Sequence, residues 1–436
     1  MTIETTVYPP GRVGSNDTGP VRRTVLPNGL RIVTEVIPGV RSVAYGAWVG
    51  VGSRHEAAAQ RGASHFLEHL LFKGTQRRDA MDIAKALDAV GGESNAITTK
   101  EYTCYYVRTR DADLPLAADL IGDMLTCARL DPAQVEAERR VILGELAMYE
   151  DDPGHAVQNL FAVALFGADD PLARPSAGDR ESVLALSWEQ IAAFYASRYR
   201  LGNVVVAAAG NVDHDEVVDL TSRGLSPDAS VDGYSRPPAS RPERREPGVR
   251  VLRRRSEQAN IMFGVPGLPY RDPRRYALTA LATALGGGYS SRLFQEIRER
   301  RGLAYATGSY AVTYADTGIL AVYAVCDPQR VDEVLAAFRR ELAAVVESRL
   351  DDEELERVKG QLAGKFVLSQ DDALSRAGRL TQGELFEDEI TSLGEVLRRI
   401  DAVSASDVQA VAVELLSTPA TLAVVGPFDE DRAFAL

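Results

Sequence analysis

The sequence predicts an α+β protein made of two copies of one folding unit, and three observations support this prediction. The chain has 436 residues, which is too many for one hydrophobic core and suits two or more domains. Runs with strand and helix periodicity alternate along each half. Two pairs of segments also repeat: the helical pattern that begins at Leu350 matches the one at Leu130, and residues 403–427 match residues 186–211.

Each element of the first half is predicted from its periodicity. Short runs rich in β-branched and aromatic residues, bounded by turn signals such as Pro27-Asn28-Gly29, are typical of strands. Longer segments whose apolar residues recur every three or four positions are typical of helices. In chain order we expect strands at 31–37 and 42–51, a helix containing 65–69, a helix at 79–90, strands at 94–98 and 102–110, helices at 112–127, 131–150 and 153–166, and a strand at 203–209.

The predicted domain boundaries follow the composition of the chain. Residues 1–20 are polar, lack periodicity and are expected to form a disordered tail. Residues 226–248 are rich in proline, serine and charge, which is typical of a linker. This linker separates a first α+β domain at 21–225, which carries the candidate site, from a second, homologous domain at 249–436.

Charge and hydropathy exclude some classes of function. The formal net charge of −13 repels phosphate backbones, and the sequence has no basic patch with interleaved aromatic residues, so nucleic acid is not expected as a partner. No stretch approaches the roughly 20 consecutive apolar residues that a membrane span requires. The first residues also lack the basic start and apolar run of a targeting peptide. We therefore expect a cytoplasmic protein that does not associate with membranes.

Residues 65–69, His-Phe-Leu-Glu-His, form the most informative motif of the chain. On a helix, residues four positions apart share one face and the residue at i+3 lies beside them, so His65, His69 and Glu68 converge. The order HxxEH is the inverse of the HExxH zinc motif and indicates a zinc site. The alternative is a buried polar trio on an amphipathic helix. The apolar flanking residues disfavour it, because three ionisable groups would be buried without a charge partner.

A catalytic zinc ion usually takes three protein ligands, so two histidines need one more partner. One face of the helix predicted at 131–150 carries the residues Glu138, Val141, Ile142 and Glu145. Carboxylates buried on that face would need a cation, whereas the alternative places both acids at the surface, with Glu138 beside a neighbouring arginine. The repeat sets Lys365 opposite Glu145 and the second half contains no histidine, so only the first half is expected to hold a metal ion.

The pentad at 65–69, followed about seventy residues later by Glu-Arg-Arg-Val-Ile-Leu-Gly-Glu-Leu at 138–146, resembles the pitrilysin/insulinase family of zinc metallopeptidases. The similarity is to its half-length branch, which includes the mitochondrial processing peptidases, and it covers nearly the whole chain. It implies α/β-sandwich-like units, each with a mostly antiparallel sheet packed against helices. The residues that it assigns to one bound zinc ion are the ligands His65, His69 and Glu145, with Glu138 behind them to orient a histidine.

The same resemblance implies residues that contact a substrate. Asn95 and Ala96 match a strand with an Asn-Ala-x-Thr core that binds the peptide backbone by strand addition. From the residues alone, this segment is an ordinary strand–turn–strand element. Arg298 and Tyr305 match an arginine and a tyrosine, seven residues apart, that hydrogen-bond the peptide and the oxyanion. Without the resemblance, Arg298 would be read as a solvated helix arginine.

The expected function is that of a zinc endopeptidase whose substrates, peptides or unfolded segments, are held as an added strand in an enclosed chamber. Glu68 would take the proton of a zinc-bound water, whose pKa is about 7, and pass it to the leaving amine. The resemblance implies a homodimer in which Arg298 and Tyr305 of one subunit reach the zinc of the other, with a heterodimer as the alternative. Two other functions stay open: a catalytically silent structural or regulatory subunit, and zinc chemistry on a non-peptide amide.

Overall fold

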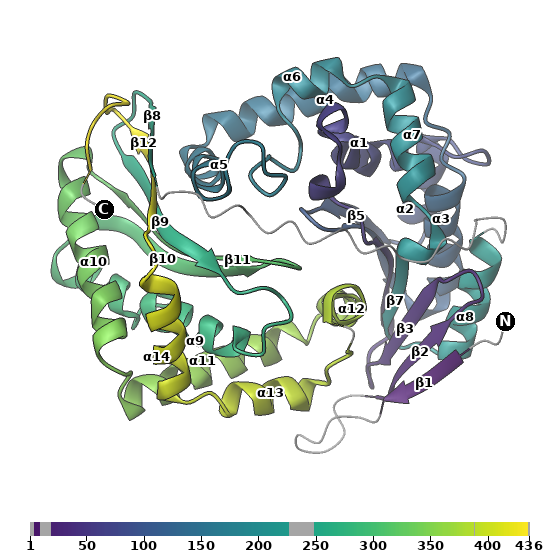
Figure 1. Cartoon of the computed structure of the whole chain (residues 1–436). Helices are drawn as coiled ribbons and strands as arrows, with labels where there is room; N and C mark the ends of the chain where they lie inside the picture. Colours follow the sequence, from purple (N-terminus) through teal and green to yellow (C-terminus); the bar gives the residue numbers. More distant parts are fainter. Residues whose placement is uncertain (1–3, 9–18, 226–247, 388, 435–436) are drawn as a thin grey trace. The chain divides into compact units, whose positions relative to one another are not determined.

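The computed structural model of the chain describes residues 4–8, 19–225, 248–387 and 389–434. These residues form two compact units, whose elements are drawn in Figure 1. The described residues of unit 1 come from Met1–Leu146, Pro175–Pro237 and Val367–Glu395, and those of unit 2 from Ala147–Arg174, Pro238–Phe366 and Val396–Leu436. Among the described helices, none combines the length and the apolar character needed to cross a membrane.

In the described part of unit 1 the strands form a seven-stranded sheet in the order β1-β2-β3-β7-β4-β6-β5. Strands β3 and β7 pair in parallel, and every other neighbouring pair in this sheet is antiparallel. Strand β5 lies at one edge, so one side of its backbone faces no other described strand. The bounds are β1 (Glu4–Tyr8), β2 (Val21–Val25), β3 (Arg31–Val36), β4 (Ser42–Val49), β5 (Glu93–Thr98), β6 (Thr103–Arg110) and β7 (Val204–Gly210).

The described part of unit 2 holds a five-stranded sheet in the order β10-β11-β9-β12-β8. Strands β12 and β8 pair in parallel, and the other neighbouring pairs are antiparallel. The bounds are β8 (Val249–Arg253), β9 (Ala259–Gly267), β10 (Ala304–Thr313), β11 (Gly318–Cys326) and β12 (Thr421–Gly426).

The two sheets share one topology. The order β10-β11-β9-β12-β8 in unit 2 corresponds strand by strand to β5-β6-β4-β7-β3 in unit 1, and the parallel pair falls at the same place. Strands β1 and β2 extend the first sheet and have no counterpart among the described strands of the second. The predicted fold class, α+β with two duplicated units and mostly antiparallel sheets packed against helices, is confirmed.

Helices follow the strands in a similar order in both halves, except that no described helix follows the last strand of the second half. In the first half they are α1 (Ala63–Leu70), α2 (Ala80–Asp88), α3 (Leu114–Thr126), α4 (Pro132–Asp151), α5 (Pro153–Phe166), α6 (Arg180–Ala185), α7 (Trp188–Arg198) and α8 (His214–Gly224). In the second half they are α9 (Arg275–Gly286), the π-helix η6 (Phe294–Arg300), α10 (Val331–Glu347), α11 (Asp352–Ser369), α12 (Ala373–Gln382), the π-helical turn η8 (Gly383–Glu387), α13 (Leu393–Asp401) and α14 (Ala405–Leu416).

Both faces of each sheet are covered, and the alternation of side chains along a strand explains how. In β9, Ile261 and Phe263 enter the core shared with α9, α10 and α14, whereas Met262 between them packs with α5. Successive side chains point to opposite faces, so one continuous apolar run supplies two cores. In unit 1, Tyr45 and Val206 enter the core with α1, α3 and α8, and α12 covers the opposite face (Figure 1).

Each unit includes a helix from the other half of the sequence. Helix α5 packs on β8, β9 and β12 in unit 2, and its topological counterpart α12 packs on β3, β4 and β7 in unit 1. The buried Glu35 of β3 is joined to α12 through ion pairs with Arg376 (3.1 Å) and Arg379. The domains predicted from composition, 21–225 and 249–436, are each continuous in sequence, so this prediction does not include the placement of α5 in unit 2 and of α12 in unit 1.

The predicted elements of the first half are present, with ends shifted by a few residues. Residues 4–8 form strand β1 and pair with β2, which corrects the prediction of a disordered tail for that segment. Its sequence Glu-Thr-Thr-Val-Tyr is rich in β-branched residues, which favour a strand once a partner strand is available. The rest of the predicted tail up to residue 18, and the predicted linker up to residue 247, lie outside the described residues.

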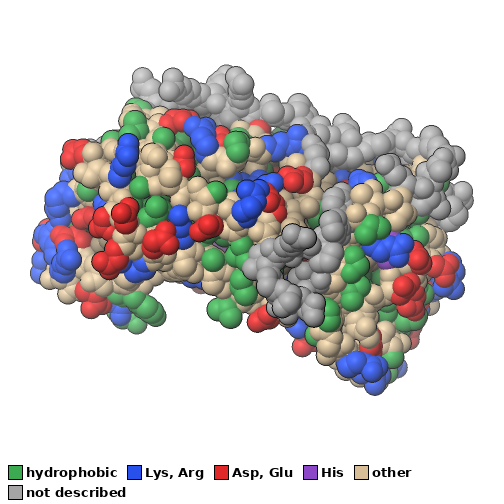
Figure 2. All heavy atoms as spheres, turned by 90° about the horizontal axis from the view of Figure 1, so that it is seen from below, with side chains coloured by type: hydrophobic (Ala, Val, Ile, Leu, Met, Phe, Trp, Pro, Cys, Tyr) green, Lys and Arg blue, Asp and Glu red, His purple; other side chains and the backbone are tan. Residues whose placement is uncertain are grey.

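Charged side chains of both signs are interspersed on the surface. Figure 2 shows one face, on which Lys or Arg side chains alternate with Asp or Glu side chains over the described residues. Some exposed charges of opposite sign are also paired along one helix, as for Arg357 and Glu353 on α11 (3.3 Å). The described part of this face therefore presents a mixture of both signs of charge.

The ion pairs of Glu35 lead to a prediction about stability. Glu35→Gln removes the charge that Arg376 and Arg379 contact, and breaking a buried ion pair from one side typically costs about 3–5 kcal/mol. We expect a loss of that size in the free energy of unfolding measured by urea denaturation. The control is Asp429→Asn, which breaks an exposed pair with Arg253 and should cost less than about 1 kcal/mol. Equal effects of the two substitutions would contradict the role given to Glu35.

Candidate metal centre

Helix α1 carries the histidine motif, and its local sequence explains where it begins and which face it buries. Gly62, at the N-cap, has a φ of 91°, a conformation that favours glycine and turns the chain into the helix. Phe66 and Leu70 point into the hydrophobic core of unit 1. His65 and His69 lie one turn apart on another face, with their ring centroids separated by 4.8 Å.

The N-terminus of α1 is held by Glu56, which the sequence analysis does not single out. The backbone N–H of Gly62 donates to Glu56 Oε2 (2.8 Å), and that of Ser64 donates to Oε1 (2.7 Å). The first N–H groups of a helix have no partner within it, so this buried carboxylate satisfies one of them and lies at the positive end of the helix. Glu56 precedes the N-cap by six residues, outside the spacing of a capping motif, so sequence patterns could not reveal it.

Helix α4 supplies two acids to the site. Glu138 is 5% exposed and Glu145 is partly exposed, so both lie against α1 rather than in open solvent. Val141 is 46% exposed, which makes the buried face narrower than the sequence suggests. The surface alternative for Glu138 does not hold, because its side chain is buried and its carboxylate contacts His69 and Lys73.

Three side-chain atoms converge between α1 and α4. Glu145 Oε2 lies 3.7 Å from His65 Nε2 and 3.5 Å from His69 Nε2. These separations are too long for good hydrogen bonds. They are close to the roughly 3.4 Å that separates two ligand atoms on one tetrahedral zinc ion, given metal–ligand distances of about 2.0–2.2 Å. One atom from each of the three residues lies within 4.8 Å of the others, so the donor set fits a metal ion.

The protonation of His65 also suits a metal ligand. Burial is the main cause that lowers the pKa of His65 to about 4, and the neighbouring His69 adds to the effect, while Glu145 opposes it. The imidazole is therefore neutral near pH 7 and offers a lone pair. Its other nitrogen, Nδ1, is buried and has no hydrogen-bond partner among the described residues.

Glu138 stands behind His69 and takes no place among the three converging atoms. Its Oε2 lies 3.1 Å from His69 Nδ1, and its Oε1 lies 2.8 Å from Lys73 Nζ. A carboxylate at Nδ1 accepts a hydrogen bond from that nitrogen and leaves Nε2 free to bind a metal. Lys73 is a second member of the site that the sequence analysis does not identify.

Glu68 lies on the same turn as His69, half-buried, and its carboxylate makes no hydrogen bond or ion pair with another described residue. Burial raises the pKa of the Tyr105 and Tyr199 hydroxyls, and the negative charge of Glu68 acts in the same direction. The Glu68 carboxylate therefore lies near two neutral tyrosines, Tyr105 and Tyr199. Their hydroxyl groups are hydrogen-bonded to each other (3.0 Å between oxygens). A carboxylate that is free of partners can exchange a proton with a small molecule beside it.

The residues predicted to bind a substrate backbone lie on the edge strand β5. Asn95 is exposed and Ala96 is buried, paired with Tyr106 and Tyr105 of β6. The next residue, Ile97, is 47% exposed on a strand whose outer edge has no described partner. Helix α1 packs against this strand, so the edge belongs to the same unit as the metal centre.

Arg298 and Tyr305 belong to unit 2, where they contact each other. The Arg298 guanidinium lies 5.1 Å from the centre of the Tyr305 ring and 4.9 Å from that of Phe294, so it is stacked between two aromatic residues. The Tyr305 side chain is 75% exposed. The two side chains therefore contact each other on an exposed part of unit 2, and their role in binding a substrate stays a prediction.

Comparison with known proteins points to one family for the chain. Residues 31–179 match the model of the insulinase family, peptidase family M16, and residues 185–362 match that of the peptidase M16 inactive domain. A protein of Streptomyces coelicolor named as an uncharacterized zinc protease is 48% identical over 428 residues, which cover 97% of this chain and 93% of that protein. The chain belongs to the M16 family. The resemblance seen in the sequence is thus confirmed.

Other relatives in the M16 family are more distant but equally complete in coverage. A Bacillus subtilis protein, also named as an uncharacterized zinc protease, is 34% identical over 93% of this chain and 98% of its own length. The solved structure of a peptidase M16 inactive domain from Pseudomonas fluorescens has a TM-score of 0.86 at 20% identity, covering 95% of this chain and all of that one. A protease structure from Helicobacter pylori has a TM-score of 0.83 at 22% identity, covering 92% and 98%. These structures support the fold.

The two M16 halves differ at corresponding positions. Glu145 of α4 and Lys365 of α11 lie the same number of residues after the start of their helices. Lys365 donates to the backbone oxygen of Gly287 (2.9 Å), and so does the side chain of Gln361 (2.8 Å). The second copy therefore uses this helix face to hold a loop where the first copy presents a candidate metal ligand.

The environment of Glu56 leads to a prediction about pH. Burial, the largest cause, raises the pKa of Glu56 from 4.5 to about 7, while the N–H groups of Ser64 and Gly62 and the charge of Lys100 act against it. Between these two values the folded state binds more protons than the unfolded state, so the contribution of Glu56 to stability falls as the pH rises.

We therefore expect that the free energy of unfolding of the metal-free wild type, minus that of metal-free Glu56→Gln, decreases between about pH 5 and about pH 7. Urea denaturation at each pH measures both quantities. A difference that stays constant or grows with pH would show that Glu56 is ionised in the fold throughout this range.

Proposed function

We propose that this M16-family chain is a zinc endopeptidase that hydrolyses peptide bonds in peptides or unfolded segments. One observation carries the proposal: His65, His69 and Glu145 present three atoms at the spacing of zinc ligands, with Glu68 on the same helical turn and free of other partners. The names of the relatives in Streptomyces coelicolor and Bacillus subtilis, both zinc proteases, support it.

One zinc ion would be held by His65, His69 and Glu145. When bound, it supplies a Lewis acid that polarises a peptide carbonyl and makes water acidic enough to attack near neutral pH. Glu138 holds His69 through Nδ1, so that Nε2 keeps its direction. The three ligands come from two helices packed in one unit, which keeps their positions independent of flexible loops.

Glu68 acts as the general base and then as the general acid. Its carboxylate takes a proton from the attacking water and returns it to the leaving amine, as a group next to the reacting atoms can do. The absence of a hydrogen-bond partner for Glu68 among the described residues supports this role, because no bond within the protein must break first. The neighbouring Tyr105 and Tyr199 stay neutral, since burial raises the pKa of both hydroxyls.

The substrate would bind as an extended strand along β5. Backbone groups at the outer edge of β5, around Asn95 and Ala96, are available to pair with a peptide, and such pairing is largely independent of substrate sequence. Arg298 and Tyr305 would add hydrogen bonds to the peptide and to the oxyanion. Stacking between Phe294 and Tyr305 fixes the guanidinium before the substrate arrives, which lowers the entropy lost on binding.

We also propose that two copies of the chain form a dimer whose chamber encloses the substrate. In this arrangement Arg298 and Tyr305 of one subunit reach the zinc site of the other. The exposure of Tyr305 on a unit that has no metal ligands of its own among its described residues supports this proposal. A heterodimer with a related chain is the alternative.

The role of Glu68 gives the first test. Glu68→Gln should leave one zinc ion per chain and lower the hydrolysis of a quenched fluorescent peptide by about 10²–10⁴-fold, because the amide cannot accept a proton. Zinc content by atomic absorption and peptide cleavage by fluorescence measure the two properties. The control Glu216→Gln, an exposed acid on α8, should keep both. A wild type that holds zinc and cleaves none of a broad peptide library would favour a catalytically silent subunit.

Subunit mixing tests the shared site. Glu68→Gln and Arg298→Ala chains should each be inactive alone. In an equal mixture, random pairing into twofold dimers gives one complete site in each mixed dimer, so activity should return to about a quarter of the wild-type value. Exchange of subunits is checked with two fluorescent labels. Exchange without any return of activity would show that each subunit works with its own Arg298.

A further inference from the structure

We infer that Lys73 is a positioning residue for the metal centre: it holds Glu138 so that this acid orients His69 and stays out of the ligand set. The inference rests on the proposed zinc site and adds a residue to it. Lys73 touches neither the converging nitrogens nor Glu145 in the described contacts. It would act through Glu138 alone.

The geometry forms a chain of three side chains. Lys73 Nζ lies 2.8 Å from Glu138 Oε1, and Glu138 Oε2 lies 3.1 Å from His69 Nδ1. The Glu138 side chain is 6% exposed and that of Lys73 is 34% exposed, so water can replace little of what the lysine provides. A buried carboxylate is costly unless it is paired, and Lys73 is the lysine or arginine that pairs with it among the described residues.

Both oxygens of Glu138 are occupied by this arrangement. Without Lys73, Oε1 would lose its partner, and the Glu138 carboxylate would be able to turn and act as a ligand of a metal ion bound at this site. A carboxylate that becomes a ligand would compete with Glu145 and release its hydrogen bond to His69. Lys73 would therefore keep the two acids of α4 in different roles. Glu145 would act as a metal ligand, and Glu138 would orient the ligand His69.

The backbone of Lys73 is fixed on both sides. It ends the 3₁₀ turn η3 (Leu71–Lys73), which continues directly from α1. The next residue, Gly74, accepts a hydrogen bond from the backbone N–H of Arg129 (3.0 Å). The hydroxyl of Thr75 then donates to the buried Asp123 of α3 (2.8 Å). These contacts hold the backbone of Lys73 at a position from which its side chain can contact Glu138.

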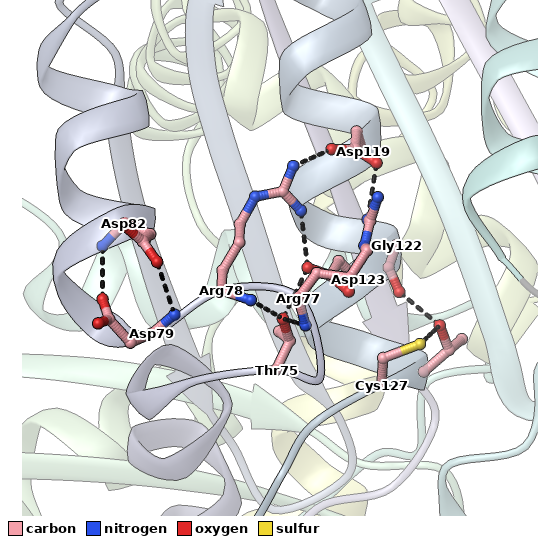
Figure 3. A network of polar contacts seen from close by, with 10 residues as sticks. Thr75, Arg77, Arg78, Asp79, Asp82, Asp119, Gly122, Asp123 and Cys127 are labelled. Atoms are coloured by element: carbon pink, nitrogen blue, oxygen red, sulfur yellow. Dashed lines mark hydrogen bonds and ion pairs between the residues drawn. The ribbon is translucent and has the colours of Figure 1, made fainter.

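Figure 3 shows the polar network that holds the segment after Lys73 against α3. Arg77 and Arg78 both reach Asp119 and Asp123 on α3, with contacts of 2.7 Å from Arg78 to Asp123 and from Arg77 to Asp119. The backbone N–H groups of Arg77 and Arg78 also donate to the Thr75 hydroxyl. Such a network restrains the chain that follows Lys73 much more than a single surface ion pair could.

Only one of the two histidines is connected to Lys73, so a substitution of Lys73 should disturb His69 and not His65. His69 Nδ1 has Glu138, whereas His65 Nδ1 has no hydrogen-bond partner among the described residues. Among the described residues, His65 is held by packing without a hydrogen bond to Nδ1, whereas His69 is held by packing and by the Lys73–Glu138 pair. A change at Lys73 should therefore reach the metal through one ligand only.

Zinc affinity of the purified full-length chain, measured by competition with a chromophoric chelator, tests the inference. Lys73→Met should weaken zinc binding about tenfold or more, the effect usual for partners of metal ligands, and Glu138→Gln should do so at least as much. Lys73→Arg keeps the charge and should restore part of the affinity. The double variant should bind no more weakly than Glu138→Gln alone, because both changes break one chain of contacts.

A matched control and a second readout separate positioning from a merely structural role. Lys85→Met removes an exposed lysine of α2 and should leave the affinity unchanged. The visible spectrum of the cobalt-substituted protein should change in Lys73→Met, since the ligand set or its geometry changes. If Lys73→Met instead lowers only the melting temperature of the metal-free chain, with zinc affinity within twofold of the wild type, the inference is overturned. If the wild type itself binds no zinc, the proposed function fails first.

Discussion

The candidate site depends on one unfavourable arrangement of polar atoms. Two imidazole nitrogens and a carboxylate oxygen lie close together, at distances too long for good hydrogen bonds. His65 is buried and neutral, and its Nε2 lies 3.7 Å from Glu145 Oε2. Polar atoms buried in this way reduce stability unless something satisfies them. A zinc ion held by His65, His69 and Glu145 would satisfy all three atoms together. The surrounding fold, from Glu56 at the start of α1 to Lys73 at its end, keeps these atoms in position.

Duplication explains how the protein can maintain such a site. Each copy folds around its own sheet, and the two copies share a strand order and a similar helix order. The first copy places the candidate ligand Glu145 on α4, while the second places Lys365 on α11 and uses it to hold a loop. One copy can therefore specialise in chemistry while the other contributes exposed groups such as Arg298 and Tyr305. Each unit has a large hydrophobic core of its own, and the candidate metal centre lies in unit 1.

Local sequence patterns predict the elements of the first half well, because helix and strand periodicity is encoded within one or two turns of chain. The spacing of His65 and His69 on a helix needs no tertiary knowledge. Glu56 and Lys73 could not be predicted as members of the site, because their partners lie at spacings that no helix or cap motif specifies. The exchange of α5 and α12 between units depends on contacts between segments far apart in the chain, such as Glu35 with Arg376. Strand β1 forms because β2 offers an edge.

The central claim is that these three residues share one metal ion. Crystals of the full-length chain grown with zinc, with diffraction data at the zinc absorption edge, test it most directly. We expect one anomalous peak per chain, about 2.0–2.2 Å from His65 Nε2, His69 Nε2 and a Glu145 oxygen, with Glu138 still bonded to His69 Nδ1. A peak bound by Glu138 in place of Glu145, or the absence of any peak between α1 and α4, would contradict the account.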